Sequence, residues 1–389
     1  MPNVLTNLAA DIYKAADIVG RELVGFIPAV TINAGTQGVA VGQTVRAHFT
    51  RQATVGNLSP SMTIPEGTDQ TVDNKTMALT KQRGVPIPWT GEDIRYVNGG
   101  AGFETIYGDQ IAQAMRALVN EIEADLAVEA YTNASRAVGD ASAVPFGSNF
   151  NVIAEARQIL ADNGMPTNDG RISLVIDTTA GTKLRNLAQL QKANEAGSDR
   201  LLRQGVLLDL QGAMLRESAQ VQNHTKGGGT GYDFAAAGEA VGETTLSVEG
   251  GTVNVTGIKA GDVITHAGDT VNKYVVNTGL TSASGEIVIG SPGLRVAGVD
   301  ANEITIGNSY KANVKLHQAC VELAMRAPAK PAGGDAAVDV MMVQDPHSGL
   351  VFEISVYKGF NKAMIYVAAV WGVKAWKPDG IALVMGSPS

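Results

Sequence analysis

Several features that mark other classes of protein are scarce or missing in this sequence. The 389 residues include a single cysteine, Cys320, which excludes an internal disulfide and is typical of a reducing cytoplasm. No stretch approaches about 18 consecutive apolar residues, so we expect no helix that spans a bilayer. Met1 to Leu8 contain no basic region and no apolar core, so we expect no signal peptide.

Charge is also scarce. Asp, Glu, Lys and Arg make up 17% of the chain, below the roughly 25% of average soluble proteins, which suggests that partners cover part of the surface. The net charge is −8 and lysine and arginine form no block, whereas a protein that grips nucleic acid through phosphates normally has a basic stripe. An acidic chain can still enclose DNA, because weak repulsion from a wall keeps the polymer mobile.

The sequence offers no nucleotide-binding or metal-binding motif. It has no GxxxxGK[ST] run, and no helix follows the glycine-rich Gly227–Gly231, so we predict a hinge there. The histidines are His48, His224, His266, His317 and His347. They are scattered, and no two of them have the spacing of metal ligands.

The remaining candidates for chemistry have ordinary structural explanations. His317 and Cys320 are three residues apart in a predicted strand, so they would point to opposite faces and form no nucleophile–base pair. Turn roles explain Asp262 and Asp269, and we expect the acidic cluster Glu121–Asp125 to be a solvated helix face. We therefore predict no catalytic, cofactor-binding or metal-binding residue.

The longest helical pattern runs from Phe103 to Asn133. Its apolar residues recur every three or four positions and share one face: Ile106, Ile111, Met115, Leu118, Val119, Ile122 and Leu126. At 1.5 Å per residue the helix would span roughly 45 Å. We interpret it as a spine laid across a sheet, with its other face wet or against a neighbouring molecule.

The N-terminal region predicts a second, shorter helix. Asp11 to Phe26 is amphipathic, and Pro28 ends the pattern. A helix placed ahead of any sheet serves either as an arm that reaches a neighbour or as a helix folded onto its own domain, and the sequence leaves both open.

Two strands flank an unusually long polar segment. Thr44–Thr50 alternates as a half-buried strand, and Lys75–Trp89 supplies a returning strand whose Pro86 and Pro88 restrict it to a sheet edge. Between them, Arg51–Asn74 has hardly any large apolar side chain, so a loop of this length is either disordered or needs another chain to lie on. We favour the second alternative, because Leu58, Met62 and Ile64 offer anchor points.

The middle of the chain alternates helix and strand, which indicates an α/β module. We predict a helix at Asn151–Asn163 closed by Gly164, a buried strand at Ser173–Ile176, a helix capped by Thr178 that runs to Leu190, a polar loop over 191–200 and a strand at Gly212–Glu217.

Composition changes near Asn223, and short β runs replace the helices. The predicted runs are Thr244–Val248, Thr252–Val255, Asp262–Thr265, Lys273–Val276, Glu286–Ile289 and Glu303–Ile306. Their spacing indicates a small β-barrel inserted in a host domain. The host then resumes with a long strand at Asn313–Met325, a hairpin of Val338–Gln344 and Val351–Val356, and strands at Ala363–Trp376 and Ile381–Met385.

This order of parts resembles tailed-bacteriophage major capsid (coat) proteins of the branch that carries an inserted β-barrel domain. The local matches are Gly257–Ile264, Leu316–Ala324 and Trp371–Pro378. Trp371 stands where that family usually has tyrosine. A long N-terminal extension ahead of the arm is not expected, so the resemblance implies a separate scaffolding protein.

The resemblance implies an α+β fold with an N-terminal arm, an extended β-hairpin loop, a spine helix with a peripheral sheet, an α/β axial domain and the inserted barrel. The corresponding residues are 1–43 for the arm, 44–90 for the extended loop, 91–150 for the peripheral domain with spine 103–133, 151–222 for the axial domain, 223–315 for the insert and 316–389 for the C-terminal sheet.

The resemblance also implies a structural function without an enzymatic activity, a cofactor or a membrane. Copies would assemble in the host cytoplasm into hexamers and pentamers of an icosahedral shell, a procapsid that matures into a virion around double-stranded DNA bound without sequence specificity. Scaffolding and portal proteins would be the partners.

Contacts between copies would use the arm and the extended loop. The expected interface residues are Arg46, Arg51, Leu58, Met62, Ile64, Lys75, Lys81 and Arg83. Relatives cross-link some shells through a lysine and an asparagine, but we predict that Lys75 and Lys81 are solvated.

Three other readings belong to different classes. A compartment shell that stores an enzyme cargo shares the fold, but it would normally be shorter and lack residues 223–315. An α/β enzyme with a β accessory domain would need a convergent polar site in a deep pocket. The α/β middle of the chain argues against a β-rich receptor-binding spike.

Overall fold

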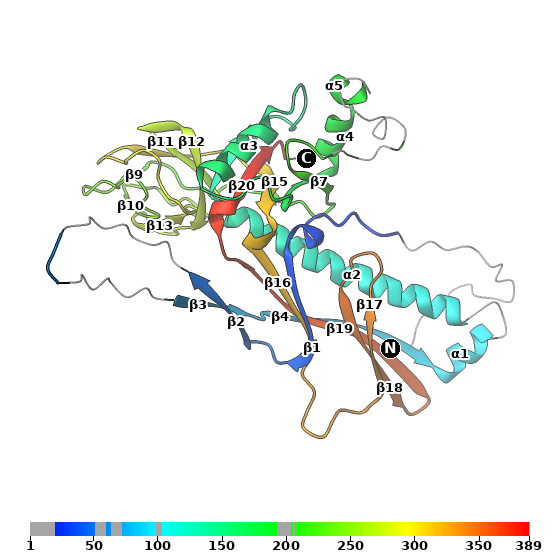
Figure 1. Cartoon of the computed structure of the whole chain (residues 1–389). Helices are drawn as coiled ribbons and strands as arrows, with labels where there is room; N and C mark the ends of the chain where they lie inside the picture. Colours follow the sequence, from blue (N-terminus) through cyan, green and yellow to red (C-terminus); the bar gives the residue numbers. More distant parts are fainter. Residues whose placement is uncertain are drawn as a thin grey trace.

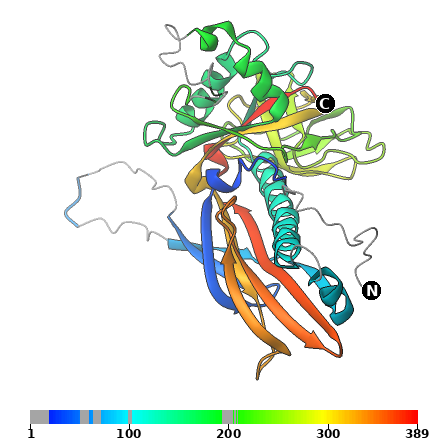
Figure 2. The same ribbon diagram turned by 90° about the vertical axis from the view of Figure 1, so that its right-hand side faces the viewer.

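The computed structural model describes residues 20–50, 60–63, 72–98, 103–192, 204, 207 and 209–388. These residues form a six-stranded sheet, a 12-stranded sheet and a separate two-stranded hairpin. A long helix runs from the larger sheet along the smaller one (Figures 1 and 2). Strands outnumber helices, so the fold is mixed α+β, as the sequence predicts.

The six-stranded sheet is built around a long central strand, β19. Its members are β1 (Thr31–Val39), β4 (Lys81–Thr90), β16 (Val321–Pro328), β17 (Ala337–Gln344), β18 (Val351–Gly359) and β19 (Lys362–Ala375). Strand β4 follows one side of β19, while β18 and β16 share the other side. The edge position predicted from Pro86 and Pro88 is therefore confirmed, since β4 pairs with no other described strand. The β17–β18 hairpin is also confirmed.

The spine helix α2 (Phe103–Thr132) is confirmed almost to the residue. A short helix, α1 (Gly91–Asn98), precedes it. The predicted apolar face packs on the six-stranded sheet, where Leu118, Ile122 and Leu126 join a core with Trp89 and Trp371. Helix α2 runs beside this sheet in Figure 2.

Three helices pack on the 12-stranded sheet, and one end of helix α2 contacts the same sheet. Its body strands are β5 (Arg136–Gly139), β20 (Ile381–Gly386), β15 (Tyr310–His317), β6 (Ile172–Ile176), β7 (Met214–Glu217) and β8 (Asn223–His224). The helices are α3 (Asn151–Asp162), α4 (Thr178–Arg185) and α5 (Ala188–Gln191). A separate apolar core between α3, α4 and these strands includes Ile153, Leu160, Leu174 and Val384.

Six short strands of the same sheet close on themselves. They are β9 (Tyr232–Phe234), β10 (Thr245–Glu249), β11 (Val263–His266), β12 (Asp269–Thr278), β13 (Gly285–Ile289) and β14 (Glu303–Ile306). Their pairings run β11–β14–β9–β10–β13–β12 and return to β11, around a core of their own. We call these strands the six-strand ring. Strand β12 also pairs with β5, which joins the ring to the body.

Two predicted strands are in fact broken between sheets. The run Lys75–Trp89 is interrupted at Leu79–Thr80, so β3 (Val72–Ala78) pairs with β2 (Thr44–Thr50) while β4 pairs with β19. The run Asn313–Met325 is interrupted by a 3-10 turn, η2 (Gln318–Cys320), and its halves lie in β15 and β16. Alternation persists through both breaks, so pattern alone does not reveal the change of sheet.

Several local predictions are wrong. Arg21–Gly25 is not helical, because the chain there runs to the spine helix and gives backbone donors to it. Residues 1–19, which hold most of the predicted arm helix, and residues 193–200 of the predicted polar loop lie outside the described part of the chain. The cap of α4 is Asp177, whose carboxylate accepts from Thr179 N, and the helix ends at Arg185.

One strand prediction fails inside the ring region. Of Thr252–Val255, only Thr252 makes an isolated bridge, and a turn follows. Within the predicted hinge Gly227–Gly231, two glycines permit close backbone contact, because a Cβ on Gly227 would lie 2.2 Å and one on Gly229 would lie 2.9 Å from Gly257 O. The hinge itself stays a prediction. Strand β1, which pairs in parallel with β16, was not predicted.

Candidate functional site: surfaces for assembly

A two-stranded hairpin projects from the body of the molecule. Strands β2 and β3 pair from Thr44↔Ala78 to Thr50↔Val72 and with no other strand in the described residues. Figure 1 shows them extending away from the six-stranded sheet. An isolated two-stranded ribbon is marginally stable in water. We call β2 and β3 the protruding hairpin.

The base of the protruding hairpin is held by apolar packing. Met77 and Leu79 are buried with Ala324 and Val370 of the six-stranded sheet. Gly372 allows this approach, because a Cβ there would lie 2.3 Å from the carbonyl oxygen of Ala78. The base is therefore rigidly attached, although the strands beyond it leave the body.

Lys75 takes part in this attachment. Its Nζ donates to Trp376 O at 2.9 Å. Burial lowers the pKa of Lys75, and the positive charges of Lys374 and Lys377 lower it further. The expectation of a solvated lysine is wrong at this position.

A second attachment joins the start of β4 to the spine helix. Lys81 Nζ lies 2.7 Å from Asp125 Oδ1 and 3.3 Å from Glu121 Oε1, and Arg83 Nε lies 3.2 Å from the same Glu121 oxygen. Trp371 Nε1 donates to Asp125 Oδ2 at 2.9 Å. Hydrogen bonding to Asp125 raises the pKa of Lys81 against the opposing effect of burial. Lys81 is therefore ion-paired and not simply solvated, contrary to the prediction.

Glu123 lies between these two acids, is buried and holds the backbone of residues 25–27. Its carboxylate accepts from the backbone N–H groups of Gly25 (2.6 Å), Phe26 (2.6 Å) and Ile27 (2.9 Å) and from Ser218 Oγ (2.8 Å). Burial raises the pKa of Glu123, while the four donors act in the opposite direction. The predicted solvated acidic face is thus wrong for Glu123, whereas Glu121 and Asp125 are partly exposed and ion-paired.

The sequence carries a signal for the burial of Glu123. Glu123 lies four residues after Val119 and three before Leu126, so it falls on the apolar stripe of the helix. A carboxylate on a buried stripe requires donors. The chain segment that supplies them, however, is about a hundred residues away and cannot be read from the pattern.

The predicted interface residues have different surroundings. Arg46 and Met62 are exposed, and Arg83 is mostly exposed beside Glu121. Arg51, Leu58 and Ile64 lie outside the described residues. The structure brings Lys81 and Arg83 together at the spine helix, and the role of all eight residues in subunit contacts stays a prediction.

Strand β17 is a further exposed surface, which the sequence analysis missed. Four apolar side chains of this strand are exposed on both of its faces: Val338, Val340, Met341 and Met342. Strand β17 pairs only with β18 within the described chain, so its outer edge is open. A long apolar edge strand favours pairing with another chain. Phe360, in the turn between β18 and β19, is also almost fully exposed.

The residues considered for catalysis are held in structural contacts. His317 Nε2 lies 2.7 Å from Asp169 Oδ2, and its Nδ1 accepts from Ala319 N. Burial raises the pKa of the Cys320 thiol to about 12, which makes it a poor nucleophile. Asp262 is buried and accepts from Gly227 N and Lys259 N, beside His224.

The described residues contain neither a metal site nor a membrane-spanning helix. No group of three or more His, Cys, Asp or Glu residues there has the arrangement of a metal site. Likewise, no helix within the described ranges is both long enough and apolar enough to cross a membrane.

Comparison with known proteins identifies the fold of this chain. No family model matches the sequence, and no curated protein matches it. A solved structure from Mycobacterium phage Che8 is 13% identical with a TM-score of 0.53, and the match covers 98% of each chain. The capsid structure of the cyanophage P-SCSP1u is 11% identical with a TM-score of 0.51, covering 98% of this chain and 94% of the other.

The chain has the fold of tailed-phage capsid proteins. At this level of identity, the likeness establishes the fold and leaves function to be argued from the molecule itself. In the phage capsid fold described here, the open surfaces are the protruding hairpin, the edge of β17 and the turn at Phe360.

Proposed function

We propose that the chain is the major capsid protein of a tailed phage, which assembles into the icosahedral shell that encloses double-stranded DNA. The observation that carries this proposal is the match to phage capsid structures over nearly the whole length of both chains. A capsid fold of this kind is structural, so the function requires surfaces that fit other copies and no catalytic site.

The protruding hairpin supports this role. It is a marginal ribbon in an isolated chain, and resting on a second copy would stabilise it. We assign contacts between copies to Arg46, Arg51, Leu58, Met62, Ile64, Lys75, Lys81 and Arg83, with Lys75 and Lys81 acting at the hairpin base. Strand β17 adds an apolar edge on which a neighbouring chain can lie.

We further propose the division of the chain that the resemblance implies. The arm is 1–43, the extended loop 44–90, the peripheral domain with the spine helix 91–150, the axial domain 151–222 and the inserted barrel 223–315. The C-terminal sheet, 316–389, completes the peripheral and axial domains. The closed pairing of the six-strand ring and its separate core support the assignment of the insert.

The partners follow from the same proposal. Copies form hexamers and pentamers in the host cytoplasm, a separate scaffolding protein guides them, a portal protein occupies one vertex, and the procapsid matures into the virion shell. The net charge of −8 fits a wall that encloses DNA without binding it specifically.

Electron microscopy of the purified full chain, alone and with co-expressed proteins from the same gene neighbourhood, tests the shell. We expect closed hollow particles of uniform diameter. A chain that remains a compact monomer under all these conditions contradicts the proposal. An enzyme packed inside the particles would instead favour the alternative, a cargo-storing compartment shell, against which the insert 223–315 argues.

A pair of variants tests the hairpin contact separately. Arg46→Glu reverses a charge on the protruding hairpin, and Lys183→Glu makes the same change on the exposed face of α4. We expect Arg46→Glu to lower the yield of particles and Lys183→Glu to leave it unchanged. Equal yields would exclude the hairpin contact and leave the shell itself standing.

A further inference from the structure

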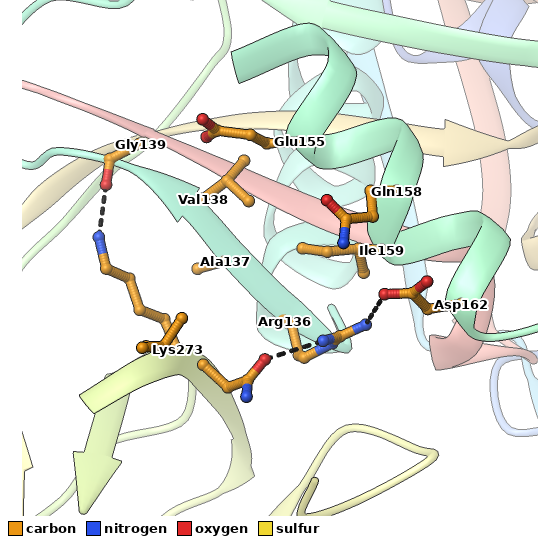
Figure 3. Close-up of a pocket in the computed structure, with 11 residues that line it drawn as sticks. Arg136, Ala137, Val138, Gly139, Glu155, Gln158, Ile159, Asp162 and Lys273 are labelled. Atoms are coloured by element: carbon orange, nitrogen blue, oxygen red, sulfur yellow. Dashed lines mark hydrogen bonds and ion pairs between the residues drawn. The ribbon is translucent and has the colours of Figure 1, made fainter. Parts of the chain in front are cut away.

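Two arginines meet where the six-strand ring joins the body. Arg136 belongs to β5 and Arg295 follows β13 of the ring. Arg136 Nη1 donates to Asn272 Oδ1 at 3.0 Å, and its Nη2 lies 3.4 Å from Asp162 Oδ2 (Figure 3). Arg295 Nη2 donates to Asn163 Oδ1 at 2.8 Å. The two cations are close enough to repel each other, and the charge of Arg295 together with burial lowers the pKa of Arg136.

The two arginines have few ionic partners at this junction. The side chain of Arg136 is 8% exposed, and its ion-pair partner, Asp162, is 43% exposed and at the long distance given above. No ion pair of Arg295 is found in the described residues. The Nε atoms of both arginines are buried without a hydrogen-bond partner in the same residues. A buried cation that lacks its full set of acceptors is costly, and an anion beside Arg136 would relieve this cost.

A cavity opens directly beside Arg136. Its volume is about 260 Å³, and β5, α3 and β12 form its walls. A water molecule takes up about 30 Å³ of liquid, so the space accommodates a tetrahedral oxyanion with its hydration. Figure 3 shows the guanidinium of Arg136 at one end, beside Asp162, and Glu155 toward the other end near Gly139.

The charges of the cavity confine an anion to the Arg136 end. Glu155 disfavours negative charge at the opposite end. Lys273 also lines the cavity, and its Nζ donates to Gly139 O at 2.6 Å, which leaves ammonium protons for other acceptors. Asp162 is exposed enough to rotate away from Arg136 when a better acceptor arrives.

We propose that this cavity binds a small oxyanion of the phosphate or carboxylate class, which hydrogen-bonds to the guanidinium of Arg136. The planar guanidinium fork fits two oxygens of such a group. The bound anion contacts β5 of the body and β12 of the ring together, so it stabilises their junction. The inference does not depend on the proposed capsid function, because it concerns the folded chain alone.

Thermal unfolding of the unassembled full chain in sodium phosphate, compared with sodium chloride at matched ionic strength, tests the site. We expect phosphate to raise the midpoint in a concentration-dependent way that chloride does not reproduce, with saturable binding at one site by calorimetry. Arg136→Gln should abolish the response. Arg157→Gln, which changes an arginine on α3 outside the cavity lining, should retain it.

A second variant keeps the test decisive if Arg136→Gln fails to fold. Asp162→Asn removes the competing carboxylate and should tighten phosphate binding by about two- to fivefold, the range for a partly exposed ion pair. Identical midpoints in phosphate and chloride, or a phosphate response that survives Arg136→Gln, would overturn the proposal.

The same measurement on assembled particles separates two sources of the oxyanion. If particles keep the phosphate response, the natural ligand is a free ion. If the response is present in the isolated chain and lost on assembly, a carboxylate from a second copy occupies the site. Both outcomes support the oxyanion site, and the failure of any particle to form would count only against the capsid function.

Discussion

The contact between Glu123 and the start of the described chain yields a quantitative prediction. Replacing Glu123 by alanine removes the acceptor for the N–H groups of Gly25, Phe26 and Ile27 and for Ser218 Oγ. A buried donor left without a partner costs about 1–3 kcal/mol, and the energies of one shared acceptor do not add. We therefore expect a loss of about 3–5 kcal/mol in the free energy of unfolding, because Glu123→Ala breaks a buried hydrogen-bond network and leaves several donors unpaired.

The burial of Glu123 sets the size of the expected loss in the free energy of unfolding. Glu123 is 1% exposed, so water cannot replace the carboxylate unless the 25–27 segment moves away from the spine helix. Glu123→Gln keeps the volume of the side chain but offers one neutral acceptor oxygen and points an amide N–H₂ at the donors, so we expect a smaller but clear loss. Glu121→Ala, on the same helix, removes a partly exposed ion pair and should cost below about 1 kcal/mol.

Urea unfolding of the unassembled chain, followed by tryptophan fluorescence, measures these differences. We expect the midpoint of Glu123→Ala to fall by about 1 M or more at an unchanged slope. Amide exchange should become faster at residues 25–27 before it does elsewhere, because the loosened segment opens locally. A Glu123→Ala midpoint equal to that of Glu121→Ala would refute the reasoning, since the four hydrogen bonds would then contribute nothing beyond a surface pair.

Other parts of the molecule give further predictions. Lys81→Ala breaks the pair with Asp125 and should lower the free energy of unfolding by about 1 kcal/mol, a difference that shrinks in high salt. Gly372→Ala forces apart backbone at the hairpin base and should cost more than about 2 kcal/mol. Cys320, with its thiol pKa raised to about 12, should resist alkylation at pH 8 in the native chain and react after unfolding. Burial lowers the pKa of Lys315 to about 8, so between pH 8 and about 10.4 the unfolded chain binds more protons and stability should rise with pH, a rise that Lys315→Met removes.

Each of these expectations has an outcome that excludes it. For Lys81→Ala, the prediction is wrong if urea titrations at low and high salt give the same loss in the free energy of unfolding. For Gly372→Ala, the control is Gly359→Ala, whose new Cβ would meet nothing closer than 3.7 Å. Equal stability of the two variants would contradict the prediction. Rapid alkylation of native Cys320 would show that the thiol is accessible. For Lys315, parallel curves of stability against pH for the wild type and Lys315→Met would show that the buried amine does not titrate in this range.

Long, strongly periodic elements were predictable from the sequence. The spine helix was placed to within a residue because its apolar positions repeat over eight turns and the core they contact is continuous. The β17–β18 hairpin was equally clear, since two alternating runs flank a turn with Asp345 and Gly349.

Strand boundaries failed where alternation continues across a change of partner. Strand β3 ends at Ala78 and β4 begins at Lys81, yet the apolar pattern hardly changes between them. Only the position of β19 decides that β4 belongs to the six-stranded sheet. Sheet membership depends on residues far away in the chain, so local spacing carries no information about it.

The same limit applies to the candidate sites. Periodicity put Glu121–Asp125 on one turn of a helix, but the fate of each carboxylate depended on what came to lie against it. Lys81 pairs with Asp125, and the backbone of the 25–27 segment donates to Glu123. The arginine pair at the ring junction could not be read from the sequence, because α3, α4, α5 and most of the ring lie between Arg136 and Arg295 in the chain.

By itself the sequence determined the kinds of element, their order, the absence of nucleotide and metal motifs, and a likeness to phage coat proteins, because these depend on local spacing and composition. Tertiary structure alone decided which strands share a sheet, which charges are buried and which surfaces remain open. The physical reason is that burial and hydrogen bonding are settled between segments that meet only after the chain has folded.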